Sequence, residues 1–67
     1  MNTEMKRYID LVGGRRAAAE KLDCSYQLVC KLVNGETAVT GKRAMDIITQ
    51  FPEVSLKGLL EGSQDAA

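Results

Sequence analysis

Apolar residues recur along this chain with the spacing of amphipathic helices. Two stretches carry the complete i, i+3, i+4, i+7 pattern, which places side chains on one face of a helix. The first is Met5, Tyr8, Ile9 and Val12, and the second is Ala44, Ile47, Ile48 and Phe51. The pattern predicts one helix over about residues 3–12 and another over about residues 41–51. We expect both stripes to form core.

Capping and breaking residues mark the ends of these two helices. Thr3 and Thr40 are the predicted N-caps, because a hydroxyl can accept from the free N–H groups of the first turn. The pair Gly13-Gly14 stops the first helix. Pro52 ends the other, since the residue before a proline avoids helical geometry.

Two shorter helices are predicted between the stripes. A run of three alanines favours a helix over about residues 15–22. Ser25 is a natural N-cap for the next helix, over about residues 25–33, with Val29, Leu32 and Val33 facing inward. Asn34-Gly35 ends it, because these residue types tolerate left-handed geometry.

A short fifth helix completes the predicted fold. Ser55 caps it, Leu56, Leu59 and Leu60 share one side, and Gly62 closes it. Residues 63–67 are expected to form a frayed tail. We therefore predict an all-α fold, a compact bundle of five short helices, with one domain over residues 1–62.

Composition adds a local charge asymmetry to this picture. The 67 residues suffice for one domain with a thin core, and their formal net charge is zero. Residues 15–43 are nevertheless net +3, whereas the chain from Glu53 onward is net −2. A local positive surface matters more to DNA than overall charge does. The alternative is that these charges form an ordinary solvated face.

Several function classes lack support in the sequence. The chain has no histidine, and Cys24 and Cys30 lie too far apart for a CxxC pair, so we expect no metal site. No paired acids or phosphate loop suggest an enzyme, and no cofactor or small-molecule substrate is implied. No signal peptide or membrane-spanning run is evident. The expected location is the cytoplasm, with free thiols.

The stretch over residues 15–34 has the packing pattern of a helix-turn-helix. Ala19 provides the small side chain needed where two helices cross steeply, and Asp23 stands four residues later, where glycine is usual. Aspartate enters left-handed conformations more readily than most residues. The sequence RRAAAEKLDCSYQLVCKL over residues 15–32 resembles the Cro/CI-type helix-turn-helix of phage and bacterial repressors. It is most similar to short all-helical Cro proteins and YdaS-like regulators.

The resemblance extends over nearly the whole chain and implies a lambda-repressor-like DNA-binding fold. The third helix is then the recognition helix, in the major groove. The implied base contacts are Tyr26, Gln27, Cys30 and Lys31. The implied phosphate contacts are Arg15, Arg16, Ser25, Asn34, Lys42 and Arg43. Among these residues, Gln27 is the strongest candidate for a base contact, since its amide can pair bidentately with adenine.

Each of these residues also has a structural interpretation. The alternative for Gln27 and Lys31 is that they are solvated surface positions of the helix. The alternative for Tyr26 is that it packs at the edge of the core. Cys30 is as readily an inert, half-buried thiol. Arg16 can instead pair with Glu20, four residues on. Lys42 and Arg43 can be partly neutralised by Asp46.

The expected function is operator binding as a symmetric dimer. Proteins of this kind usually place two recognition helices on one face of a pseudo-palindromic operator. A weak homodimer is expected through the apolar C-terminal residues Phe51, Val54, Leu56, Leu59 and Leu60. The output is then Cro-like repression by occupancy. Alternatives are an antitoxin or autoregulator with a protein partner, and a protein-interaction module without DNA binding.

Overall fold

The computed structural model describes residues 1–61, which form five α-helices and no strand. The helices are α1 (Thr3–Val12), α2 (Arg15–Leu22), α3 (Tyr26–Asn34), α4 (Gly41–Gln50) and α5 (Leu56–Glu61). The expected all-α fold of five short helices is confirmed. The predicted helix stop at Gly62 and the predicted tail over residues 63–67 lie outside the described residues.

The helix boundaries follow the capping residues. α1 and α2 occupy their predicted ranges. α3 lies one residue further along than predicted, because Ser25 is its N-cap, with extended backbone and with Oγ accepting from the Leu28 N–H at 3.0 Å. α4 ends at Gln50, because Phe51 leaves helical geometry (φ −138°, ψ 89°) just before Pro52.

The start of α1 differs from the prediction. Its cap is Asn2 rather than Thr3: Asn2 Oδ1 accepts from the Met5 N–H at 3.0 Å, while Thr3 is already helical and exposed. Asn2 is 0% exposed, and its Nδ2 donates to the Leu59 carbonyl of α5 at 2.9 Å. Its backbone N–H donates to the Val33 carbonyl of α3 at 2.8 Å. One residue thus joins α1 to both α3 and α5.

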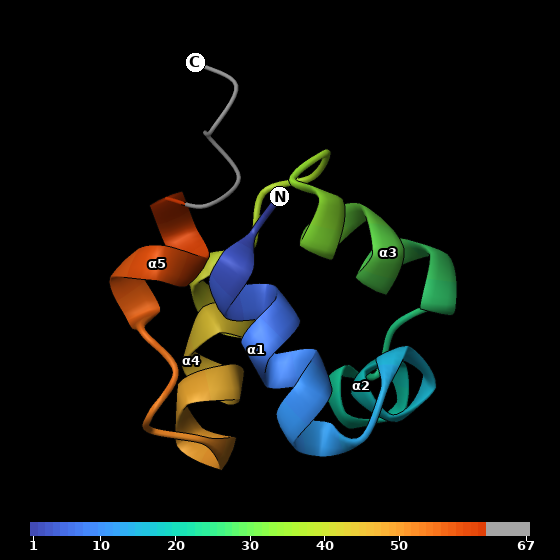
Figure 1. Cartoon of the computed structure of the whole chain (residues 1–67), viewed down its shortest axis with the longest axis horizontal. Helices are drawn as coiled ribbons and strands as arrows, with labels where there is room; N and C mark the ends of the chain where they lie inside the picture. The colour runs from blue at the N-terminus through green and yellow to red at the C-terminus, as the bar shows by residue number, and fades with distance from the viewer. Residues whose placement is uncertain (62–67) are drawn as a thin grey trace.

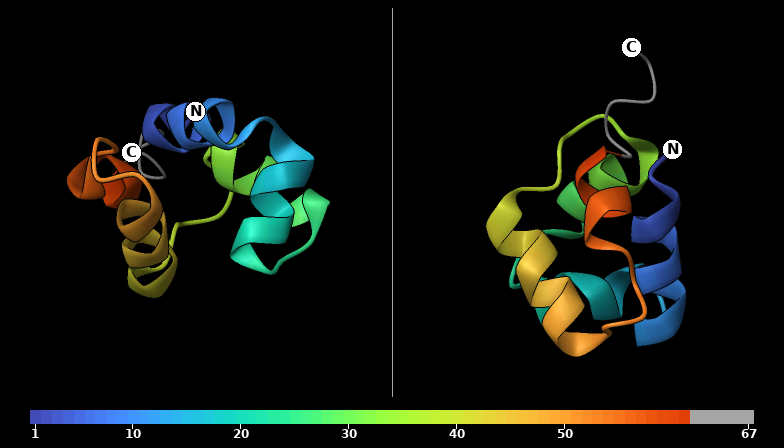
Figure 2. Two further views of the ribbon diagram at one scale, coloured as in Figure 1. Left: turned by 90° about the horizontal axis from the view of Figure 1, so that it is seen from below. Right: turned by 90° about the vertical axis from the view of Figure 1, so that its left-hand side faces the viewer.

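α1 lies between two helix pairs (Figures 1 and 2). α2 and α3 pack together on one side of it, and α4 and α5 on the other. The core comprises Met5, Tyr8, Ile9, Ala18, Ala19, Leu22, Val29, Leu32, Val33, Val39, Ala44, Ile47, Val54 and Leu59. Val12, Ile48 and Phe51 are partly buried at its edge, so both predicted stripes face the core. No helix within residues 1–61 has the length and apolar character to span a membrane.

Tyr8 connects α1 to the end of α4. It is the largest fully buried side chain, and its hydroxyl donates to Gln50 Oε1 at 2.8 Å. Its ring meets Phe51 edge-to-face, with centroids 5.9 Å apart. Burial raises the pKa of Tyr8 above its usual 10.0, because the charged phenolate is poorly solvated there. The fold therefore favours the neutral phenol.

Candidate nucleic-acid interface

α2 packs against α3 and contributes two small side chains to the core. Ala18 and Ala19 are buried, and the Ala19 carbonyl accepts from the Cys24 N–H at 3.0 Å. Between the helices, Asp23 has left-handed backbone (φ 54°, ψ 51°), the conformation predicted for this position. A short polar side chain tolerates this region better than most residues do. Asp23 thus makes the turn that glycine usually makes.

α3 has an apolar inner face and a polar outer face, as predicted. The inward residues are Val29, Leu32 and Val33, all buried. The outward residues are Tyr26, Gln27, Lys31 and Asn34, which are exposed, and Cys30, which is half-buried. Tyr26 keeps 48% of its surface exposed. All the predicted base-contacting side chains therefore share one side of one helix.

The two predicted phosphate contacts at the ends of α3 already have partners within the chain. Ser25 Oγ accepts from the Leu28 N–H in capping the helix. Asn34 Nδ2 donates to Glu36 Oε2 at 3.2 Å. The Glu36 carboxylate places negative charge beside the end of α3. The start of this helix is therefore a better position for a phosphate than its end.

The start of α2 lacks the groups that normally complete a helix N-terminus. Its N-cap is Gly14, which makes no side-chain hydrogen bond, and its first turn contains no acidic residue. That turn contains Arg15 and Arg16 instead, and both are exposed. The helix dipole disfavours cations and favours anions at this end. An external anion would therefore satisfy both the free N–H groups and the arginines.

Both arginines contact α3. Arg15 Nη1 donates to Cys30 Sγ at 3.2 Å. The guanidinium carbon of Arg16 lies 5.8 Å from the centroid of the Tyr26 ring. The fold thus brings together two predicted phosphate contacts and two predicted base contacts. We call these four residues the arginine cluster.

The charges of the arginine cluster are not neutralised by carboxylates within residues 1–61. The ion pairs of that part of the chain join Lys6 to Asp10 and Arg7 to Glu4, all on α1. The pair between Arg16 and Glu20 that the sequence allows is not formed. Arg16 has the Tyr26 ring as its neighbour instead, so its positive charge remains available.

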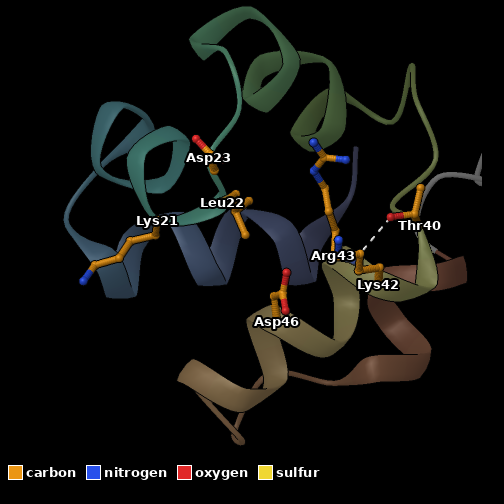
Figure 3. A pocket seen from close by; sticks show the side chains of 7 residues that line it. All are labelled: Lys21, Leu22, Asp23, Thr40, Lys42, Arg43 and Asp46. Carbon is orange, nitrogen blue, oxygen red and sulfur yellow. Dashed lines mark hydrogen bonds between the residues drawn. The ribbon is translucent and has the colours of Figure 1, made fainter.

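Lys42 and Arg43 belong to a second, separate group at the start of α4. They line a cavity of about 370 Å³ together with Lys21, Leu22, Asp23, Thr40 and Asp46 (Figure 3). Thr40 Oγ1 accepts from the Arg43 N–H at 3.2 Å, which confirms the predicted cap. Arg43 Nε is buried without a hydrogen-bond partner, and neither Lys42 nor Arg43 forms an ion pair with Asp46 in the described chain.

Lys21 and Asp23 also belong to this second group, because both line the cavity. The sequence did not predict that they lie beside Lys42 and Arg43. Lys21 lies in the net-positive stretch over residues 15–43 but is not among the predicted DNA contacts. Figure 3 shows its side chain pointing away from Arg43. Asp23 and Asp46 offset part of the positive charge of the cavity. The second group is therefore less strongly positive than the arginine cluster.

The predicted dimer residues divide into two sets. Val54 and Leu59 are 2% and 0% exposed because they fill the core between α5 and the rest of the chain. The expectation that these two form a dimer surface is therefore wrong for this fold. Leu56 and Leu60 are each 38% exposed, and Phe51 is half-buried. Leu56 and Leu60 are therefore the leucines of α5 with apolar surface exposed for contact with a second chain.

The comparisons with known proteins returned no match. No protein-family model, no curated protein and no solved structure matches this chain.

Proposed function

We propose that this chain is a sequence-specific, double-stranded-DNA-binding transcriptional regulator. In this proposal α2, the Asp23 turn and α3 form a helix-turn-helix of a lambda-repressor-like fold. The supporting observation is the start of α2, where Arg15 and Arg16 occupy an uncapped, acid-free N-terminus and contact the outer face of α3. A DNA phosphate supplies the charge and the acceptor oxygens that this helix start lacks.

α3 is the recognition helix in this proposal, lying in the major groove with its first turns at the base edges. Gln27 and Lys31 are exposed on it one helical turn apart. The Gln27 amide pairs bidentately with adenine, and the Lys31 ammonium donates to guanine O6 or N7. These two side chains carry most of the sequence preference.

Phosphate contacts on either side of α3 fix its position in the groove. Arg15 and Arg16 provide them from α2, and Lys42 and Arg43 provide them from the start of α4. Lys42 is exposed and Arg43 is half-buried at that helix start, where both line the cavity of the second group.

The chain acts as a homodimer on a pseudo-palindromic operator, because one short recognition helix reads few base pairs. Two copies place their α3 helices about 34–36 Å apart on one face of the duplex. The exposed Leu56 and Leu60 of α5 support a weak dimer contact. Occupancy of the operator then blocks transcription, as in a Cro-like repressor in the cytoplasm of a bacterial or phage-infected cell.

Selection of bound sites from random DNA duplexes tests this function. The unaltered chain should enrich a pseudo-palindrome. Gln27→Ala should lose about 1–3 kcal/mol of specific binding and relax the preference at one base pair of each half-site. Met45→Ala, at a 54% exposed position on α4, is the matched control and should select the same sites. Failure of the unaltered chain to enrich any sequence would refute the proposal.

A further inference from the structure

The outer side of α3 is divided into two stripes. Tyr26 and Cys30 are four residues apart, so they lie on one edge of the helix, and Gln27 and Lys31 form the neighbouring edge in the same way. The Tyr26–Cys30 edge faces the start of α2, where it contacts Arg16 and Arg15. Contacts within the chain thus occupy one stripe and leave the other open.

We propose that Tyr26 and Cys30 are positioning residues, which hold the two arginines of α2 toward phosphates, and that they do not read bases. This inference rests on the proposed DNA binding and deepens it. It replaces the base-contacting roles that the sequence resemblance implied for these two residues. Sequence preference is then left to Gln27 and Lys31.

The chemistry of the two partners suits this role. An aromatic face and a thiol attract a guanidinium without cancelling its charge. A carboxylate would cancel it, as Glu4 does beside Arg7 on α1, where Nη2 and Oε2 lie 3.7 Å apart. Arg15 and Arg16 therefore keep their charge and their remaining N–H donors for phosphate oxygens.

Positioning also lowers the entropic cost of binding. A free arginine has many rotamers, and fixing one in a complex costs part of the binding free energy. Because Tyr26 and Cys30 already restrict the arginines in the free chain, less freedom is lost on DNA. The gain is independent of base sequence, since every phosphate is chemically the same.

A double-mutant cycle on DNA affinity tests the Tyr26 part of this inference. Binding is measured on a duplex selected by the unaltered chain and on an unrelated duplex, at several salt concentrations. Tyr26→Leu should lower the affinity for both duplexes alike, by about two- to fivefold. It should also flatten the salt dependence toward that of Arg16→Ala, and it should add little in the Arg16→Ala background. Tyr26→Phe keeps the ring and should restore the salt dependence.

Cys30 is tested in parallel through Arg15. Cys30→Ala removes the acceptor of Arg15 Nη1 and should lower the affinity for both duplexes alike. Cys30→Ser retains an acceptor, so its affinity should be close to that of the unaltered chain. Gln27→Ala serves as the contrast, since it should weaken the selected duplex alone. Thermal melting by circular dichroism confirms that each variant is folded.

Three results would overturn the inference. A change of base preference in Tyr26→Leu or Cys30→Ala would show that these residues read bases. Additive effects of Tyr26→Leu and Arg16→Ala would show that the pair is not coupled on DNA. If the unaltered chain bound neither duplex, the proposed function would fail and this inference with it, whereas the first two results leave the proposed function intact.

Discussion

The starts of α1 and α2 are built in opposite ways. α1 has a fully buried side-chain cap, Asn2, and an acidic residue, Glu4, in its first turn. α2 has a glycine cap without a side-chain hydrogen bond, and two arginines where acids would be favourable. Both helices are firmly packed against neighbours, so the difference is not one of order. The two helix starts differ in the source of the hydrogen-bond acceptor for their first N–H groups and of the negative charge that balances the helix dipole.

The start of α1 is completed by groups of the chain itself, whereas the start of α2 is not. In α1 the chain itself provides the acceptor and the negative charge, and Glu4 Oε1 also accepts from the Ser55 N–H of the α5 cap at 2.7 Å. In α2 nothing in the described chain provides either. Local choices that oppose stability tend to mark functional positions. The start of α2 is a candidate for such a position, because α1 shows that this fold can cap a helix fully.

The largest expected effect comes from removing the cap of α1. Asn2→Ala leaves the Leu59 carbonyl and the Met5 N–H without their side-chain partners. It should lower the free energy of unfolding by roughly 2–4 kcal/mol, as estimated from losing a cap and a buried hydrogen bond. Urea denaturation measures this. Thr3→Ala is the matched control, since Thr3 is exposed and does not cap, and an equal loss there would contradict the assignment of Asn2.

The next largest effect concerns the contact that holds α2 against α3. Ala19 is 8% exposed in the core, beside the turn that leads to α3, so Ala19→Leu should overpack the core and destabilise the fold by about 1–3 kcal/mol. It should also weaken DNA binding, because the arginines of α2 shift away from α3. Ala17→Leu, at a half-buried position of the same helix, should cost less. Normal melting and normal DNA binding of Ala19→Leu would contradict tight packing around Ala19.

A moderate, pH-dependent effect is expected in the body of α1. Burial raises the pKa of Tyr8 in the folded chain, so the stability it contributes is present below about pH 10 and is lost as pH rises through the folded pKa. Tyr8→Phe should cost about 0.5–1.5 kcal/mol at neutral pH through the lost Gln50 hydrogen bond. It should also abolish this part of the alkaline loss. Unfolding curves at neutral and alkaline pH measure both, and an unchanged alkaline loss in Tyr8→Phe would contradict the assignment.

The smallest expected effect comes from placing an acidic residue in the first turn of α2. Ala17→Glu gives the first turn of α2 the acid that α1 has. It should stabilise the free chain by about 0.3–1 kcal/mol through the helix dipole. The same carboxylate should weaken binding to every duplex, because it repels phosphate. Ala17→Gln adds a similar shape without charge. Equal DNA affinity of the Glu and Gln variants would show that the start of α2 does not face phosphates.

The sequence predicted most of what depends on local signals. Helical period located the helices, and Ser25, Thr40 and Ser55 were correctly identified as caps, because a cap contacts residues only three positions away. Asp23 was correctly placed in left-handed geometry for the same reason. Backbone and side-chain preferences over a few residues suffice for such features.

Features that join distant segments were not predictable in this way. Asn2 is a cap because Val33 and Leu59 lie beside it, and no local pattern reveals that. Val54 and Leu59 have the same apolar character as Leu56 and Leu60, and only tertiary packing buries the first two. Likewise, no local pattern pairs Arg15 with Cys30 or Arg16 with Tyr26. The candidate site residues were foreseen individually, whereas their contacts required the fold.

The salt dependence of duplex binding is the decisive measurement for the proposal that this chain binds DNA through phosphate contacts. The unaltered chain should bind duplex DNA, and the logarithm of its association constant should fall linearly with the logarithm of salt concentration. Arg15, Arg16, Lys42 and Arg43 together should give a slope of about −3.6 per chain, at about −0.9 for each phosphate contact. Affinity that stays constant over the salt series, or no binding even at the lowest salt, would contradict it.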